Sequence, residues 1–156
     1  MKEKVLIGLS GGVDSSVATH ILLKKGYDVS GVTMKVYDSK KYPNLTSGSR
    51  SSCFGGDEEE DIEDARNVAK HFDIPFYVID LSDRYEEIVL NYFRDEYKSG
   101  RTPNPCIKCN QQIKFGMLVE ESTKAGIDFD YFATGHYAKV EFDEAQRAIS
   151  PGQAVV

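Results

Sequence analysis

Short apolar runs alternate along the chain with segments in which apolar residues recur every three or four positions, and this alternation predicts a mixed α/β protein. Compact, β-branched runs bounded by glycine, proline or aspartate are typical of strands. The predicted strands span residues 5–9, 28–34, 75–80 and 131–134. The helices predicted from amphipathic spacing span residues 14–25, 58–72, 85–93 and 112–124.

The order strand, helix, strand is typical of a parallel sheet, because parallel neighbours need a crossover connection. We therefore expect an open, mostly parallel sheet with helices on both faces. Two segments interrupt the pattern. Residues 37–56 are rich in serine, glycine, lysine and asparagine, which predicts a long mobile loop, and residues 99–110 show no periodicity.

The length of 156 residues fits one domain with a single core. An apolar share of 40% and a charged share of 28% are typical of a soluble globular protein. No apolar run approaches the roughly 20 residues that span a bilayer, and the N-terminus enters a strand at once. We therefore expect a cytoplasmic protein with no signal peptide and no membrane partner.

The formal charge of −6 disfavours a broad nucleic-acid-binding face, because such faces are usually basic. The charge is unevenly distributed, however. Residues 57–64 are acidic at every position except Ile62, whereas residues 98–114 contain cations and no acid. An acidic protein of this kind can still present a local basic path.

A loop rich in glycine and serine joins the first predicted strand to the first helix. It consists of Gly8, Leu9, Ser10, Gly11, Gly12, Val13, Asp14 and Ser15. Glycines let a backbone turn and approach a ligand closely, and a helix N-terminus offers unpaired N–H groups that suit an anion. A plain glycine turn with an N-cap at Asp14 or Ser15 is the competing interpretation. No lysine follows the glycines, so the loop is not a Walker A motif.

The string of residues 10–16 resembles the PP-loop of ATP pyrophosphatases, a family that cleaves ATP between its α and β phosphates and transfers AMP. The resemblance implies a fold of the adenine nucleotide α-hydrolase type. It also implies that Asp14 acts near the pyrophosphate, through Mg²⁺.

The second distinctive segment, residues 100–110, holds two prolines and then Cys106 and Cys109. The neighbouring cations Arg101 and Lys108 favour the thiolate, which is the nucleophilic form of cysteine, and a helix that begins near Cys109 acts in the same direction. Three other interpretations stay open. The first is half of a structural zinc site, although a second Cys or His pair at matching spacing is missing. The second is a redox dithiol, and the third is an inert buried pair.

Together these segments resemble the bacterial-type tRNA-specific 2-thiouridylases, enzymes that place sulfur on the wobble uridine of tRNA. The matching stretches are residues 8–16, Cys53 with the acidic helix to Phe72, residues 100–115 and residues 133–138. They cover nearly all of residues 1–140, which the resemblance implies to be a PP-loop ATP-binding domain. The run Arg-Thr-Pro-Asn-Pro-Cys is the most specific of these matches.

The resemblance also implies a mechanism in which ATP adenylates the C2 oxygen of the uridine, a thiolate or persulfide attacks C2, and AMP departs. The positions that would hold ATP are residues 8–15, Met34 and Gly135. The positions that would face the target base are Asn104, Pro105 and Cys106. Cys109 would be the nucleophile, and the partners would be tRNA and a sulfur-donor protein or sulfide source.

An alternative chemistry within the same type of family uses the Cys-x-x-Cys pair and a third cysteine to hold an iron–sulfur cluster. Many relatives have aspartate where this chain has Cys106, so a cluster bound by Cys106 and Cys109 stays open. Cys53 is interpreted as incidental rather than as the third ligand. His136 follows Gly135 at the end of a strand, where open α/β sheets bind ligands, and is either an RNA contact or a solvated loop residue.

Residues 141–156 resemble part of the C-terminal β-barrel of the family, whose members run to more than twice this length. We therefore expect the tRNA-binding middle region to be absent, together with the partner cysteine that carries the persulfide. Two other functions stay open: a nucleotide-binding module that lacks full thiolation activity, or another PP-loop adenylating enzyme, such as an amidating ligase or a lysidine-type synthetase. The Cys-x-x-Cys segment disfavours another PP-loop adenylating enzyme, since the reactions of amidating ligases and lysidine-type synthetases need no thiols.

Overall fold

The computed structural model describes residues 2–38, 40–41 and 58–137. The chain divides into two compact units. Met1–Thr33, Ile62–Tyr77 and Asp128–Val156 form the first unit, and Met34–Asp61 and Val78–Ile127 form the second. Most of the predicted loop at residues 37–56, and all of the predicted barrel remnant at residues 141–156, lie outside the described residues.

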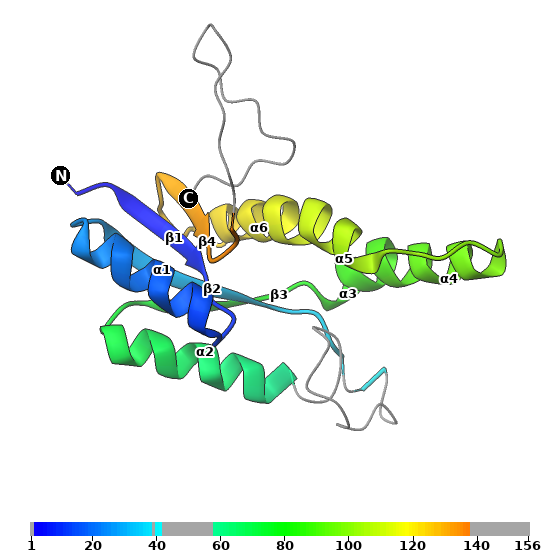
Figure 1. Cartoon of the computed structure of the whole chain (residues 1–156), viewed down its shortest axis with the longest axis horizontal. Helices are drawn as coiled ribbons and strands as arrows, with labels where there is room; N and C mark the ends of the chain where they lie inside the picture. The colour runs from blue at the N-terminus through cyan, green and yellow to red at the C-terminus, as the bar shows by residue number, and fades with distance from the viewer. Residues whose placement is uncertain (1, 39, 42–57, 138–156) are drawn as a thin grey trace, which may run out of the picture. The chain divides into compact units, whose positions relative to one another are not determined.

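The first unit is built around a four-stranded sheet with the strand order β3-β2-β1-β4 (Figure 1). The strands are β1 (Lys4–Gly8), β2 (Asp28–Lys35), β3 (Phe76–Asp80) and β4 (Tyr131–Thr134). β1 is parallel to both of its neighbours, with its last residue, Gly8, opposite Val32 on β2 and Thr134 on β4. The predicted open, parallel α/β sheet is confirmed, and each predicted strand agrees with an observed strand to within one residue.

The direction of strand addition reverses at β1. From β1 the chain passes through α1 (Val13–Lys24) to β2 and through α2 (Glu58–Phe72) to β3, and it later returns on the opposite side of β1 as β4. Open α/β sheets bind ligands outside the carboxyl ends of their strands, at the point where the strand order reverses. The ends of β1 and β4 are therefore the expected binding edge of this sheet.

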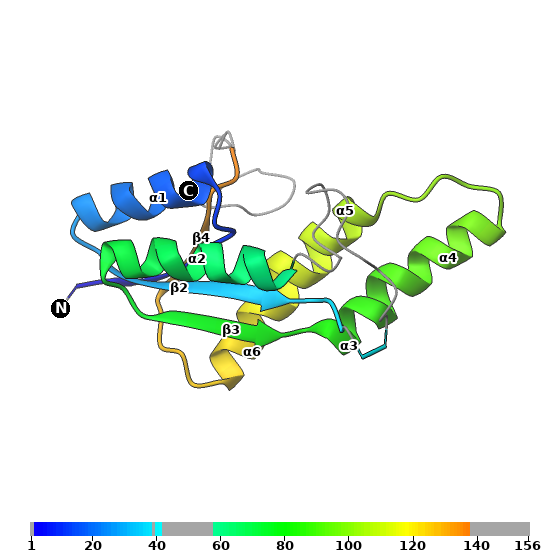
Figure 2. The ribbon, with the colours of Figure 1, turned by 90° about the horizontal axis from the view of Figure 1, so that it is seen from below.

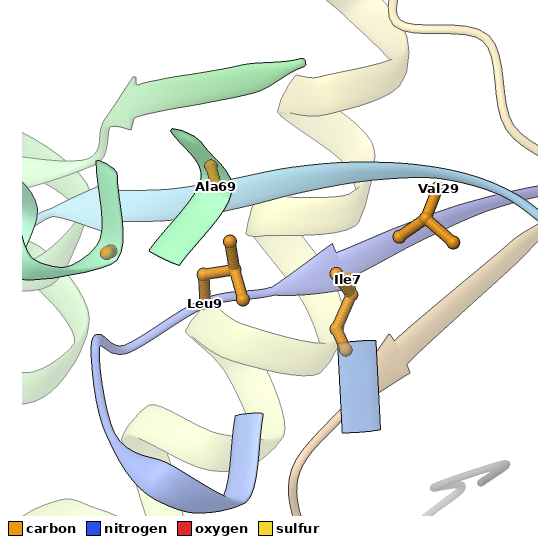
Figure 3. Packing of buried hydrophobic residues seen from close by; sticks show 5 residues of the cluster. Ile7, Leu9, Val29 and Ala69 are labelled. Atoms are coloured by element: carbon orange, nitrogen blue, oxygen red, sulfur yellow. The ribbon is translucent and has the colours of Figure 1, made fainter. Parts of the chain in front are cut away.

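The hydrophobic core of the first unit lies between the sheet and the two helices α1 and α2, which cover one face (Figure 2). Its central residues are Ile7, Leu9, Val29, Ala65 and Ala69 (Figure 3). Leu6, whose side chain points to the other face of β1, is as fully buried as Ile7. Both faces of β1 are thus covered, which explains why its sequence is continuously apolar instead of alternating.

α1 buries only part of the apolar stripe that its spacing predicts, which consists of Val17, Ile21 and Leu22. Leu22 packs against the core as predicted, but Val17 and Ile21 are about half exposed, and Ser15 and Thr19 are buried instead. The Thr19 hydroxyl donates to the carbonyl of Ser15 at 2.8 Å, so its burial leaves no hydrogen-bonding group unsatisfied. The prediction is therefore wrong for Val17 and Ile21, because small hydroxyl residues take part of the buried face.

The second unit contains two long helices, each interrupted by a π-helical segment. One consists of α3 (Ser82–Tyr85), η1 (Glu86–Leu90) and α4 (Asn91–Lys98), and the other of α5 (Pro105–Lys108), η2 (Cys109–Met117) and α6 (Leu118–Lys124). η1 and η2 are the π-helical parts, and η1 contacts both α5 and η2. The predicted helix at residues 85–93 is confirmed as part of a longer one.

The second long helix begins seven residues before the predicted start at residue 112, so the expectation of an irregular segment up to residue 110 is wrong. The Asn104 side chain accepts a hydrogen bond from the backbone N–H of Ile107 at 3.2 Å, and Pro105 occupies the first helical position. Asparagine at the N-cap followed by proline is a favoured way to begin a helix. The buried residues of this helix are spaced by four, five and four positions: Cys109, Ile113, Leu118 and Ser122.

Two polar contacts of the second unit anchor the chain on either side of the undescribed segment. Glu58, at the start of α2, is buried and accepts hydrogen bonds from the backbone N–H groups of Val36 (2.5 Å) and Tyr37 (2.9 Å). Burial raises the pKa of Glu58 above its ordinary value, although the two N–H donors act in the opposite direction. Its carboxylate therefore fixes the backbone that leaves β2.

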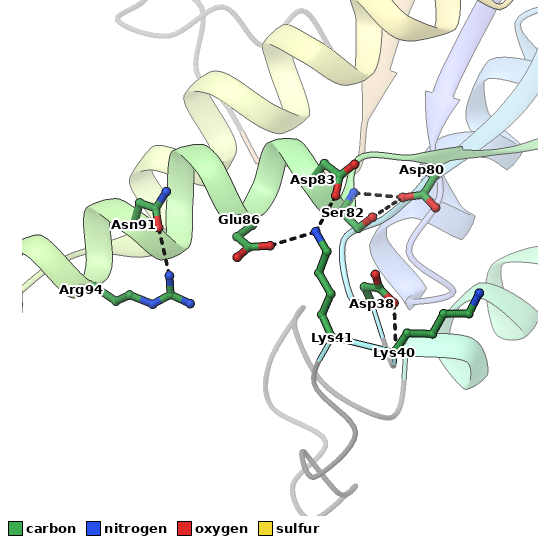
Figure 4. Close-up of polar contacts among 9 residues, drawn as sticks. All are labelled: Asp38, Lys40, Lys41, Asp80, Ser82, Asp83, Glu86, Asn91 and Arg94. Atoms are coloured by element: carbon green, nitrogen blue, oxygen red, sulfur yellow. Dashed lines mark hydrogen bonds and ion pairs between the residues drawn. The ribbon is translucent and has the colours of Figure 1, made fainter.

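Lys41 forms the other contact (Figure 4). Its Nζ lies 2.7 Å from Asp83 Oδ1 and 3.1 Å from Glu86 Oε2, and these hydrogen bonds raise the pKa of Lys41. All three groups are at the surface, where such pairs contribute little to stability. The contacts of Lys41 therefore orient the chain that follows β2 and add little to the stability of the fold.

None of the helices in the described part of the chain combines the length and the apolar character that a membrane crossing requires.

Replacement of Glu58 by alanine removes the acceptor of two buried backbone N–H groups. We expect Glu58→Ala to lower the free energy of unfolding by about 1–3 kcal/mol. Glu58→Gln, which keeps an acceptor oxygen and has no charge to desolvate, should cost clearly less at pH 7. Urea denaturation at pH 7 measures both variants, and equal losses would show that the acceptor is unimportant.

The raised pKa of Glu58 also has a defined effect on pH dependence. A raised folded-state pKa adds stability below the ordinary glutamate pKa of about 4.3 and loses that stability as the pH rises through the raised value. Because glutamine does not titrate, Glu58→Gln should flatten the pH dependence of unfolding across this window. Denaturation curves at a series of pH values, compared with the parent chain, provide the measurement.

Candidate functional site

The loop between β1 and α1 continues the sheet for one residue and then turns sharply. The N–H of Leu9 donates to the carbonyl of Val32 at 2.8 Å, and Gly11 then adopts a positive φ of 74°. A Cβ on Gly11 would lie 2.7 Å from Asp64 Cβ and 3.1 Å from the backbone nitrogen of Ala65. The loop thus packs directly against the backbone of α2, and only glycine fits at this position.

Ser15 binds the loop to the first turn of α1. Its buried hydroxyl donates to the carbonyl of Gly12 at 3.1 Å and lies 3.3 Å from the hydroxyl of Ser10. The N-cap is Gly12, so the competing prediction of an N-cap at Asp14 or Ser15 is wrong. The helical ladder starts with the bond from the Ser16 N–H to the Gly12 carbonyl, at 3.2 Å. The amides of residues 13–15 precede this ladder and form the kind of helix N-terminus that suits an anion.

Gly135, directly after β4, meets the same turn from the other side. A Cβ at this position would lie 2.6 Å from the backbone nitrogen of Ser15 and 2.8 Å from the carbonyl carbon of Asp14. The structure therefore brings together two segments that the sequence separates widely, residues 8–15 and Gly135. Met34, also predicted to hold ATP, is the penultimate residue of β2 and is partly buried.

Asp14 has a partner that the sequence did not reveal. The hydroxyl of Tyr137, itself almost fully exposed, donates to Asp14 Oδ1 at 2.8 Å. This hydrogen bond and the negative charge of Asp14 raise the pKa of Tyr137. In the sequence, the only indication of this contact was the position of Tyr137 two residues after Gly135.

His136, the predicted RNA contact, is exposed, and its Nδ1 lies 2.9 Å from Thr134 Oγ1.

The two cysteines of the second unit differ in accessibility. Cys106 lies in the first turn of the second long helix and is exposed, whereas Cys109 lies one turn later with only 5% of its surface exposed. Both are present as thiols. Because the helix begins at Pro105, its N-terminal dipole acts on the turn that holds Cys106, and the expectation of a helix start near Cys109 is wrong.

The surroundings of the cysteine segment are arranged by Tyr92 and Glu96 of α4. The backbone N–H of Asn104 donates to the Tyr92 hydroxyl at 3.4 Å, and Lys108 Nζ lies 5.3 Å from the centre of the Tyr92 ring. Arg101 donates to both oxygens of Glu96, at 2.6 and 2.7 Å, which lowers the pKa of Glu96. The charge of Arg101 is thus paired with Glu96, whereas the Lys108 ammonium lies over the Tyr92 ring.

The predicted site residues thus form two groups. Residues 8–15, Gly135 and His136 belong to the first unit, whereas Met34 and residues 104–109 belong to the second. Within the described ranges, no group of three or more His, Cys, Asp or Glu side chains is arranged to hold a metal ion. Cys53 lies outside the described residues, so its interpretation as incidental rather than as a third ligand stays a prediction.

Comparison with known proteins places this geometry in a family. The family described as "tRNA methyl transferase HUP domain" matches residues 3–153. The chain belongs to that family.

Relatives with high identity carry one name. The chain is 52% identical over 142 residues to the tRNA-specific 2-thiouridylase MnmA of Endomicrobium trichonymphae, a match that covers 91% of this chain and 39% of the relative. It is 50% identical over 141 residues to the protein of the same name from Clostridium perfringens, covering 90% and 37%. The chain therefore spans less than half the length of these relatives. Among solved structures, an NMN synthetase from Francisella tularensis is similar with a TM-score of 0.48 and 22% identity, over 83% of this chain and 44% of that one.

The two glycines of the loop give a matched pair of variants. Gly11→Ala places a Cβ against α2 and a side chain at positive φ, so we expect a loss of about 1–2 kcal/mol of unfolding free energy and loss of ATP binding. Gly12→Ala has an extended backbone, and the nearest atom to its Cβ, Ser10 Oγ, is 3.4 Å away. It should change stability much less. Denaturation and isothermal calorimetry with ATP test both, and similar behaviour of the two variants would contradict the assigned packing.

Proposed function

We propose that this chain carries out the ATP-dependent step of tRNA 2-thiolation, in which sulfur replaces the C2 oxygen of the wobble uridine. The observation that carries the proposal is the identity of about half of all residues with named tRNA-specific 2-thiouridylases over nine-tenths of the chain. The close approach of Gly135 to the first turn of α1 supports it, because it forms a backbone-lined edge suited to phosphate. Since tRNA is a cytoplasmic substrate, we place the reaction in the cytoplasm.

In the first step, the loop of residues 8–15 binds ATP. The amides of residues 13–15 donate to the leaving pyrophosphate, and the helix dipole of α1 favours its negative charge. Gly135 contributes to holding ATP at this edge, and Met34 is the further position that the resemblance assigns to ATP. Asp14 and the hydroxyl of Ser10 offer the hard oxygen donors that Mg²⁺ prefers, and the ion would neutralise charge on the phosphates. The product is a uridine whose C2 oxygen is bonded to AMP.

In the second step, sulfur attacks C2. Asn104, Pro105 and the exposed Cys106 face the base, and Cys109 is the nucleophile as the persulfide charged by a sulfur donor. Its outer sulfur forms the new C2–S bond, the C2–O bond breaks, and AMP leaves with that oxygen. The Cys106 thiolate then attacks the Cys109 sulfur, so the S–S bond to the transferred sulfur breaks, that sulfur stays on the base, and the Cys106–Cys109 disulfide that forms is reduced by an external thiol. Because Cys109 is buried, the start of η2 has to open before its sulfur reaches the base. A π-helical turn is a weak point in a helix and suits such an opening.

An iron–sulfur cluster is the alternative source of sulfur. Cys106 and Cys109 supply two thiolate ligands one helical turn apart, which is a usual spacing, and soft sulfur donors suit iron. The cluster would carry a sulfide to C2. A third ligand from this chain would have to be Cys53, and an ultraviolet–visible spectrum of anaerobically purified protein tests for the cluster directly.

The proposal predicts separate effects for the two groups of residues. Asp14→Ala should reduce ATP/pyrophosphate exchange in the presence of tRNA by at least about tenfold, because its carboxylate would hold the cation that neutralises the phosphates, an effect of more than about 1.4 kcal/mol. Cys109→Ser and Cys106→Ser should leave exchange intact and abolish sulfur in the product. Mass spectrometry of nucleosides from the treated tRNA measures the oxygen-to-sulfur replacement.

The controls separate the proposal from its alternatives. Asp28→Ala, which removes a carboxylate opposite Lys4 at the other end of β1 from the loop, should leave both activities unchanged. Nucleotide binding without any AMP formation, with tRNA and a sulfide source present, would instead identify a binding module. If AMP forms but the product does not depend on the cysteine thiols, the chain would be a different PP-loop adenylating enzyme.

A further inference from the structure

α4 presents two large aromatic side chains to solvent. Phe93 and Tyr97 are 38% and 61% exposed, and their ring centres lie 4.9 Å apart with the planes tilted by 52°. Residues four positions apart lie on one ridge of a helix, one turn above the other. The two rings therefore form a continuous apolar platform about one helical turn long.

The ridge beside this platform is cationic. Arg94 and Lys98 are the next residues along the chain, so they follow the same spacing one step around the helix. Arg94 Nη1 donates to Asn91 Oδ1 at 3.0 Å, which directs the guanidinium along the helix surface (Figure 4). An aromatic ridge thus runs alongside a basic ridge.

The ridge on the other side of the platform connects it to the cysteine segment. Tyr92 and Glu96 hold Asn104, Lys108 and Arg101 through the contacts described above. The cation of Lys108 over the Tyr92 ring continues the alternation of aromatic and basic groups toward Cys106. Residues 98–114 contain four cations and no acid, in a chain whose formal charge is −6. α4 itself holds Asp95 and Glu96, and Glu96 is paired with Arg101, so the cations beside the rings are Arg94 and Lys98 on α4 and Lys108 over Tyr92.

We propose that this aromatic–basic ridge, made of Phe93, Arg94, Tyr97 and Lys98, binds unpaired RNA nucleotides next to the target base. Exposed aromatic rings flanked by cations are the usual platform for single-stranded nucleic acid, since bases stack on the rings and the cations contact phosphates. The inference rests on the proposed function for the identity of the RNA. It extends that function by assigning the surface that holds the nucleotides flanking the one that reacts.

The absence of tryptophan from the sequence makes a direct test possible. Tyr97→Trp introduces a single indole on the platform. Addition of a short uridine-containing single-stranded RNA should quench its emission in a saturable manner, and raised salt should weaken the effect. The same RNA annealed to its complement should quench less, because its bases are already stacked. Tyr77→Trp, at a partly exposed position (39%) on β3, should not respond.

Affinity measurements identify which groups act. By fluorescence anisotropy with the same RNA, Tyr97→Ala and Phe93→Ala should each weaken binding about tenfold. Tyr97→Phe, which keeps the ring, should bind like the parent chain. Lys98→Gln should weaken binding less and reduce the salt dependence. Thermal unfolding of each variant shows whether it is folded, so a loss of binding is assigned to the ridge only where the melting temperature is retained.

Two results would overturn the inference. If the fluorescence of Tyr97→Trp does not change on addition of RNA although the RNA binds the chain, the RNA contact lies outside the ridge. Emission that instead depends on protein concentration in the absence of RNA would identify the ridge as a self-association surface. Both results are distinguishable from failure of the proposed function, which would appear as absent AMP and absent sulfur in tRNA whatever the ridge binds.

Discussion

The pairing of β4 with β1 is the interaction on which the candidate site depends. It sets Thr134 opposite Gly8, so the segments that leave both strands emerge at the same edge of the sheet. Gly135 then lies so close to the first turn of α1 that no side chain would fit. Because Thr134 and Gly8 are far apart in the sequence, this edge is complete only when the second unit has been traversed and the chain has returned to the sheet. The predicted phosphate-binding edge therefore forms only together with the whole parallel sheet.

Close backbone packing runs through the same region. Gly11 lies against α2, and Gly31 has Leu9 and Phe76 where its side chain would be. α1 sits close enough to the sheet that serine and threonine replace larger apolar residues on its inner face, with their hydroxyls bonded to the helix itself. Main-chain groups, held by main-chain neighbours, therefore line the loop. Such a site needs little rearrangement when an anion binds, because backbone amides have no rotamers to lose.

Much of this arrangement could be predicted from the sequence, because the strands and α2 have strong local patterns. The Gly-Gly loop was located correctly, since it stands between an apolar run and a helical one. Three features could not be predicted by periodicity. α1 buries Ser15 and Thr19 while Val17 and Ile21 of the expected stripe are half exposed, since hydroxyl burial depends on close packing that the pattern does not encode. The start of the second long helix was missed, although Asn104 and Pro105 signalled it. Tyr137 reaches Asp14 only through the return of β4, which no local signal specifies.

The π-helical segment η2 also constrains how the chain can vary in length. Between Ile113 and Leu118 the buried face advances by five residues, while the steps before and after it are four. Loss of one residue inside this interval would convert the turn to ordinary α-helix and leave every later buried position on the same face. A deletion earlier in the helix would rotate all later residues by about 100° and expose Leu118 and Ser122. Length differences of one residue among homologues should therefore concentrate at residues 114–117.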